Sequence, residues 1–298
     1  MANPEIDDVT GVETTGHEWD GIKELNKPLP TWWVWVFWVT IIWGIGYTIV
    51  YPSWPTFGDY YVKGIWNWHS REAAMNEVKA GRELHADKYK AMLSMPVTEL
   101  KDKDPELFKF AAATGKVLFA DYCAPCHQTN GKGTKGYPNL QDDDWLYGGT
   151  IEDINTTIKH GVRSGDEDER SGGQTMPAKG VSGDLTEEQI NQVTEYVLSL
   201  SGNSSDKAAA ESGKAVFNDA GGCSGCHGED AKGAKGGNGI PGSPDLTDAI
   251  WLYGGKKADI KETITAGRGG VMPAWAPRFA KDPSAIVRLT AYVYSLSK

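Results

Sequence analysis

One pentapeptide occurs twice in this chain and limits what the chain can fold into. The copies are Cys123–His127 (Cys-Ala-Pro-Cys-His) and Cys223–His227 (Cys-Ser-Gly-Cys-His). The pattern is typical of covalent haem c attachment, in which two thiols bind the haem vinyl groups and the adjacent histidine ligates the iron. The chain has 4 cysteines, all of them in these motifs. The sequence therefore predicts two covalently bound haems c, attached through Cys123, Cys126, Cys223 and Cys226 and ligated by His127 and His227.

Paired cysteines also occur in redox dithiols and zinc sites, but neither requires a histidine directly after the second cysteine. Neither accounts for the Met-Pro dipeptide downstream of each motif, at Met176 and Met272. We predict that these two methionines are the second axial ligands, because proline holds each loop extended where the thioether must reach the iron. Histidine–methionine coordination occupies both axial positions of the iron and favours electron transfer over ligand binding. The sequence leaves open whether each methionine serves its own repeat or the other one.

The haem motifs belong to a longer repeat. Gly-Lys-x-x-Phe precedes each motif, and Trp-Leu-Tyr-Gly-Gly, Met-Pro-Ala and Tyr-Val-x-Ser-Leu-Ser follow each one in the same order. These landmarks recur about a hundred residues apart, which indicates two homologous domains. We expect the first domain over residues 108–201, a linker over 202–209 and the second domain over 210–298.

Each repeat predicts an entry helix, a middle helix and a closing helix. Thr150–Lys159 has apolar residues on one face, and Thr186 with Gln189 gives the capping-box signature of the first closing helix. An entry helix, a methionine-bearing loop and a last helix around one haem resemble the class I cytochrome c fold. The haem itself would supply much of so small a core.

Other methionines and histidines are weaker ligand candidates. Met92 and Met95 are reserve candidates for an axial position, and His160 is a possible competitor for the first haem. His69 and His85 lie on a polar helical segment, where a single histidine is usually a surface or packing residue.

An apolar segment precedes the repeats. Thr31–Tyr51 contains no charged residue, is rich in tryptophan and is bounded by prolines. As a helix it would be roughly 30 Å long, the thickness of a bilayer core. We predict a mobile cytoplasmic tail over residues 1–30, a retained transmembrane anchor over 31–54 and a helical connector over 55–107. Haem c attachment takes place on the outer face of the bacterial cytoplasmic membrane, so the haem domains are expected in the periplasm.

The chain is acidic, with a net charge of −10. This charge disfavours nucleic acid as a partner and favours a basic protein. The stretch between Gly161 and Met176 is longer than that between Gly267 and Met272, and its extra residues include the charged run 166–170. This insertion is either a solvated loop or part of a docking surface for a basic electron donor.

The segment Gly21–Trp33 (GIKELNKPLPTWW) resembles the membrane-entry segment of the dihaem subunit, subunit III or P, of bacterial cbb3-type cytochrome c oxidases. The order of acidic tail, tryptophan-rich anchor, connector and two cytochrome domains, each with Trp-Leu-Tyr-Gly-Gly, is also that of the family. The fold implied is mostly α, with one N-terminal transmembrane helix followed by two tandem class I cytochrome c domains.

The resemblance implies an electron-entry role in a proton-pumping haem-copper oxidase. Electrons would come from a soluble or membrane-anchored cytochrome c and pass to the monohaem and catalytic subunits, where oxygen is reduced. The chain would not be catalytic alone. Two alternatives are a free membrane-anchored dihaem shuttle and a haem peroxidase or gas sensor.

Overall fold

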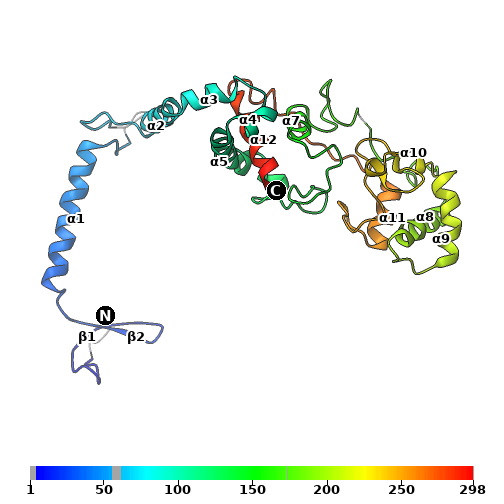
Figure 1. Cartoon of the computed structure of the whole chain (residues 1–298). Coiled ribbons are helices and arrows are strands. Elements are labelled where there is room, and N and C mark those ends of the chain that lie inside the picture. Colours follow the sequence, from blue (N-terminus) through cyan, green and yellow to red (C-terminus); the bar gives the residue numbers. More distant parts are fainter. Residues whose placement is uncertain (1–4, 56–61, 173, 298) are drawn as a thin grey trace. The chain divides into compact units, whose positions relative to one another are not determined.

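The structure is a computed structural model that describes residues 5–55, 62–172 and 174–297 (Figure 1). The chain forms two compact units, residues 1–84 and residues 85–298. The first contains the apolar segment, and the second contains both haem motifs. The described residues are mostly helical, as predicted.

The N-terminal tail contains a β-hairpin. Strands β1 (Thr14–Trp19) and β2 (Ile22–Leu25) pair antiparallel, with Trp19 opposite Ile22. The two turn residues between them, Asp20 and Gly21, both have positive φ, at 50° and 84°. Asp-Gly at this position favours a two-residue turn whose twist matches that of the strands. Residues 14–25 of the predicted tail therefore form regular secondary structure, which was not predicted from the sequence.

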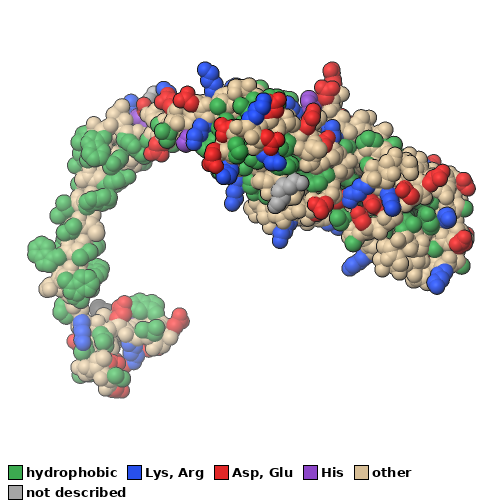
Figure 2. Space-filling view, in the orientation of Figure 1, with side chains coloured by type: hydrophobic (Ala, Val, Ile, Leu, Met, Phe, Trp, Pro, Cys, Tyr) green, Lys and Arg blue, Asp and Glu red, His purple; other side chains and the backbone are tan. Residues whose placement is uncertain are grey.

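Helix α1 (Thr31–Val50) carries the apolar segment. With 20 residues, the helix is long and apolar enough to cross a membrane. None of its residues is buried within the described part of the chain. Figure 2 shows hydrophobic side chains along its length. Apolar side chains left unpacked around a whole helix are typical of a helix that lies in lipid.

The chain folds back on the end of α1. The Ile65 N–H donates to the Ile49 carbonyl at 3.0 Å, and the Tyr51 ring packs edge-on against Trp66 at 5.2 Å. A Cβ on Gly64 would lie 2.3 Å from the Val50 carbonyl oxygen, so only glycine permits this approach. Helix α2 (Ser70–Leu84) follows.

The second unit is built from helices. In chain order they are α3 (Ala86–Met92), α4 (Val97–Lys103), α5 (Pro105–Tyr122), α6 (Ala124–His127), α7 (Ile151–His160), α8 (Glu187–Leu200), α9 (Lys207–Asn218), α10 (Ser224–His227), the 3-10 helix η1 (Gly233–Gly236), α11 (Lys257–Ala266) and α12 (Ser284–Leu296). Thr186 and Gln189 form the predicted capping box at the start of α8. Part of the predicted connector belongs to this unit, because Met92 and Leu100 are fully buried against Ala111 of α5 and Ala291 of α12.

The closing helices are exchanged between the repeats. Entry helix α5 of the first repeat packs on α12, the last helix of the second repeat, and α9 packs on α8 (Figure 1). The repeated phenylalanine of each entry helix meets the repeated tyrosine of the opposite closing helix: Phe119 lies 5.1 Å from Tyr292, and Phe217 lies 5.2 Å from Tyr196. Each compact core thus combines segments of 108–201 and 210–298, whereas the sequence suggests that each repeat closes on its own last helix.

A short connection explains the exchange. Helix α8 ends at Leu200 and α9 begins at Lys207, with Asp206 capping α9 through the Ala208 and Ala209 amides. So few residues between two helices make them antiparallel neighbours. Because α8 packs on α9, α5 packs on α12, the closing helix of the other repeat.

The Glu195 carboxylate fixes this connection. Its side chain is 2% exposed and pairs with the Lys257 ammonium at 2.6 Å. It also accepts hydrogen bonds from the Ser204 hydroxyl at 2.6 Å and from the Asp206 amide at 3.1 Å. Burial raises the pKa of Glu195, but the Lys257 contact and these hydrogen bonds outweigh it and lower the pKa to about 2, from an ordinary value of 4.5.

We predict that Glu195→Gln destabilises the second unit by about 1–3 kcal/mol at pH 7, since a neutral amide at this buried position cannot pair with Lys257 or accept the same hydrogen bonds as the carboxylate. A depressed carboxyl pKa contributes stability above the unfolded value and loses it as the pH falls through the folded value. The wild-type protein should therefore lose stability between about pH 4.5 and pH 2 more steeply than the variant. Denaturant unfolding followed across that range tests this, with the exposed Glu188→Gln as control. Equal stability of Glu195→Gln and wild type at pH 7 would contradict it.

Candidate haem sites

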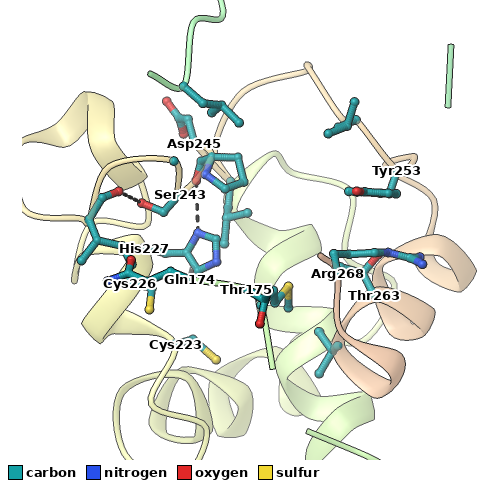
Figure 3. A pocket seen from close by; sticks show the side chains of 18 of the residues that line it. Gln174, Thr175, Cys223, Cys226, His227, Ser243, Asp245, Tyr253, Thr263 and Arg268 are labelled. Carbon is teal, nitrogen blue, oxygen red and sulfur yellow. Dashed lines mark hydrogen bonds between the residues drawn. The ribbon is translucent and has the colours of Figure 1, made fainter. Parts of the chain in front are cut away.

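The second Cys-x-x-Cys-His motif opens into a cavity. Helix α9 leads to Cys223, and the short helix α10 carries Cys226 and His227 (Figure 3). The cavity has a volume of about 300 Å³, within the range of small-molecule sites. Apolar side chains from three helices line it: Val193 and Val197 of α8, Phe217 of α9, and Ile260 and Ile264 of α11.

Both motif histidines have the same orientation. The Nδ1 atom of His227 lies 3.1 Å from the Pro244 carbonyl oxygen, and that of His127 lies 3.0 Å from the Pro138 carbonyl oxygen. A neutral imidazole that donates from Nδ1 has its lone pair on Nε2, the atom that can then ligate a metal. Burial lowers the pKa of both histidines, which favours the neutral form needed for ligation.

The four motif cysteines are free thiols. Burial raises the pKa of Cys223, and it raises the pKa of Cys123 to about 12 with a smaller contribution from Cys126. Cys123 and Cys223 are therefore held as thiols, and all four cysteines are unpaired, as covalent attachment to a vinyl group requires.

The two Met-Pro loops cross over. Met176 exchanges backbone hydrogen bonds with Arg268 of the second repeat, at 2.9 and 3.0 Å. Met272 exchanges the equivalent bonds with Val162 of the first repeat. Consequently Met176 lines the cavity that contains Cys223 and His227. Met272 packs against the other core together with Cys123.

Glycine makes the crossing possible at both sites. A Cβ on Gly161, after α7, would lie 2.3 Å from the Met272 carbonyl oxygen, and one on Gly267, after α11, would lie 2.5 Å from that of Met176. Both glycines also have positive φ, at 74° and 69°. The end of each middle helix is therefore shaped to receive the methionine loop of the other repeat.

None of the reserve candidates lines the cavity beside His227. Met92 is fully buried in the cluster that it forms with Leu100, Ala111 and Ala291, and Met95 packs against the same cluster. The His160 Nδ1 atom lies 2.8 Å from an Asp166 carboxylate oxygen, so this ring binds the charged insertion. The His85 ring packs on Phe110 at 5.1 Å. His69 belongs to the first unit, whereas both haem motifs belong to the second.

Tyr147, Arg163, Tyr253 and Arg268 are among the cavity residues that were not predicted from the sequence. A signal for them exists in the repeats. The tyrosines are those of the two Trp-Leu-Tyr-Gly-Gly segments, and an arginine follows the glycine after each middle helix, in Gly161-Val162-Arg163 and Gly267-Arg268.

The cavity fits a haem c in the chemistry of its donors. It offers two free thiols at one end, an imidazole with an available Nε2, a thioether and apolar walls. A flat apolar group with two reactive vinyl substituents matches this set.

Comparison with known proteins identifies the family. Residues 11–58 match the family described as N-terminal domain of cytochrome oxidase-cbb3, FixP. Residues 112–201 match cytochrome c, and residues 208–293 match cytochrome C oxidase, cbb3-type, subunit III. The cbb3-type cytochrome c oxidase subunit FixP of Azorhizobium caulinodans is 49% identical over 292 residues, which cover 98% of this chain and 95% of that protein.

This chain belongs to the FixP/CcoP family of cbb3-type cytochrome c oxidase subunits. The subunit CcoP of Azospirillum brasilense is 46% identical over 297 residues, and that of Rhodobacter capsulatus is 40% identical over 292 residues. The A. brasilense alignment covers 99% of both chains. Membership confirms the predicted family and the predicted fold, with one apolar N-terminal helix and two cytochrome c domains. As a FixP/CcoP subunit, the chain is part of a membrane-bound cbb3 oxidase complex, and its cytochrome c domains imply haem c.

Proposed function

We propose that this FixP/CcoP subunit holds two covalent haems c and relays electrons toward oxygen reduction in other subunits of the oxidase. Cys123 and Cys126 attach one haem, and Cys223 and Cys226 attach the other. His127 and His227 ligate the two irons. The observation that carries the proposal is the pair of motif histidines, each held through Nδ1 by a backbone carbonyl beside free thiols.

The axial methionines are crossed in this proposal. Met176 of the first repeat ligates the haem of His227, and Met272 of the second repeat ligates the haem of His127. The support is the position of Met176 in the cavity of His227 and the packing of Met272 with Cys123. Filled coordination at both irons suits electron transfer and disfavours the peroxidase and gas-sensor alternatives.

The relay connects a periplasmic donor with the oxidase. We place the N-terminus in the cytoplasm and the haem domains in the periplasm, where haem c is attached. Electrons pass from this subunit to the monohaem and catalytic subunits. Since the chain is part of the oxidase complex, a free shuttle is the less suitable alternative.

A basic cytochrome c suits the acidic surface as the donor, because opposite charge speeds association. Much of the charged insertion is paired internally: the Asp166 carboxylate binds His160, which lowers the Asp166 pKa, and the Arg170 guanidinium binds Asp153 at 2.9 Å. Glu167 and Asp168 are its exposed acidic residues. We assign the donor contact in this insertion to those two side chains.

Oxygen uptake by the purified oxidase complex tests the relay and the donor contact together. With Cys223→Ser and Cys226→Ser, uptake driven by a basic cytochrome c should fall at least about tenfold, since one electron carrier is missing. With Glu167→Gln and Asp168→Asn, the rate should fall at low ionic strength and approach wild type at high salt. Glu187→Gln, exposed on α8, is the matched control.

The complex must stay assembled for these rates to be compared. Co-purification with the catalytic subunit and reduction of its haem b by a small-molecule reductant establish this. Unchanged cytochrome c-driven uptake in an assembled complex that lacks the second haem would refute the relay. Unchanged salt dependence in the double charge variant would refute the donor contact alone.

A further inference from the structure

Two arginines and two tyrosines line one wall of the cavity beside Cys223 and His227. We call Tyr147, Arg163, Tyr253 and Arg268 the Arg–Tyr cluster; all four line the cavity. Figure 3 shows Tyr253 and Arg268 on the far side of the cavity from Cys223, Cys226 and His227. Tyr147 and Arg163 come from the first repeat, and Tyr253 and Arg268 come from the second.

Arg163 is fixed in place by three contacts. Its Nε donates to the Gly270 carbonyl at 2.6 Å, and its Nη1 donates to the Gln174 carbonyl at 3.2 Å and to the Tyr147 hydroxyl at 3.3 Å. Its backbone has φ of 52°, an uncommon value for a residue with a side chain. These bonds use Nε and Nη1, so among the described residues Nη2 is left for a ligand.

Arg268 is held in a comparable way. Its guanidinium stacks over the Tyr253 ring at 4.6 Å, and its Nε donates to the Thr263 hydroxyl at 3.0 Å. Its Nη1 donates to the Glu262 carboxylate at 3.4 Å. Its Nη2 is buried and makes no hydrogen bond within the described part of the chain, although the same carboxylate lies 3.4 Å from it. A buried N–H donor on a cation without an acceptor is costly, and an anionic ligand in the cavity would remove that cost.

The shape of haem c identifies this anionic ligand as its propionate groups. The vinyl groups lie on one edge of the macrocycle and the two propionate carboxylates lie on the opposite edge. With the vinyl groups bonded to Cys223 and Cys226, the propionates extend toward the far side of the cavity, where the cluster lies. Arginine is well suited to carboxylates because its planar fork donates in parallel.

We infer that the Arg–Tyr cluster binds the propionates of the haem attached to Cys223 and Cys226, and that Arg163 thereby lets the first repeat set the redox potential of the haem in the second. This inference rests on the proposed haem binding. The ferric haem carries one more positive charge than the ferrous haem. A cation beside it therefore disfavours oxidation and raises the midpoint potential.

A redox titration of the purified complex, followed by haem c absorbance, tests the inference. Arg163→Gln and Arg268→Gln should each lower the midpoint potential of one haem c more than that of the other, and both variants should affect the same haem. Arg163→Lys and Arg268→Lys keep the charge and should retain most of the wild-type potential. Arg82→Gln on α2, which removes the same charge in the other unit, is the control.

The outcomes separate this inference from the proposed function. Haem c content is measured first: loss of covalent haem from wild type or Arg82→Gln would contradict the proposed haem binding itself. With two haems per chain retained, unchanged potentials in both glutamine variants would overturn the inference. Equal shifts of both haems, or a shift of the same size in Arg82→Gln, would overturn it as well. If Arg268→Gln loses haem through misfolding, Arg163→Gln and the two lysine variants still decide the result.

Discussion

In a chain that carries only the first haem, Met272→Ala should remove the axial thioether and Met176→Ala should leave it in place. The single-haem chain is made with Cys223→Ser and Cys226→Ser. Met272 packs in the same core as Cys123, whereas Met176 lines the other cavity. Loss of the sixth ligand should lower the potential of the remaining haem by roughly a tenth of a volt or more, since axial ligands set potentials over a range of about 0.8 V.

Ferric absorbance and carbon monoxide binding measure this directly. The Met272→Ala chain should lose the methionine–iron charge-transfer band and bind carbon monoxide when reduced. The Met176→Ala chain should retain the band and bind little. Met95→Ala is the matched control, because Met95 packs against the separate cluster that contains Met92 and Leu100. The reverse pattern, with Met176→Ala opening the first haem, would mean that each repeat uses its own methionine.

Gly213→Val should prevent the second haem core from forming. A Cβ on Gly213 would lie 2.0 Å from the Gln192 carbonyl oxygen of α8, and one on Gly115 would lie 2.0 Å from the Arg288 carbonyl oxygen of α12. Backbone atoms cannot move aside without separating the helices, so we expect destabilisation of about 3 kcal/mol or more from either substitution. The result should be a large loss of covalent haem from the purified protein.

Haem content per chain and thermal unfolding check this prediction. Lys214→Val and Lys116→Val are matched controls, since both lysines are exposed one residue further along the same helices. They introduce the same side chain without the contact. A Gly213→Val chain with full haem content and wild-type stability would show that α8 and α9 do not approach as closely as described.

Local sequence patterns account for most of the helices and for the site residues. Thr186 and Gln189 predict the start of α8, and the absence of charge in Thr31–Tyr51 predicts α1. The Cys-x-x-Cys-His spacing predicts that the thiols and the imidazole of one motif lie together, because one short helix fixes how they project. The Asp20-Gly21 dipeptide is a local signal of the same kind, and it accounts for the turn and the hairpin around it.

Contacts between distant segments were not predictable in this way. Periodicity shows that Val193 and Val197 share one face of α8, but it does not show that this face covers the second haem motif. Glu195 on α8 looks like an ordinary charged helix residue in the sequence, and its burial becomes evident only when Lys257 and the Ser204–Asp206 segment lie beside it.

The sequence by itself predicted two haem c sites with their attachment residues and histidines, and it identified the apolar N-terminal helix and the family to which the chain belongs. These depend on covalent spacing, segment length and local composition. Only the tertiary structure decided how the repeats share their parts, with α12 on α5, α8 on α9, and each methionine loop beside the other repeat's motif. The physical reason is that two similar closing helices suit either entry helix almost equally well. The short connection from Leu200 to Lys207 selects the exchanged arrangement.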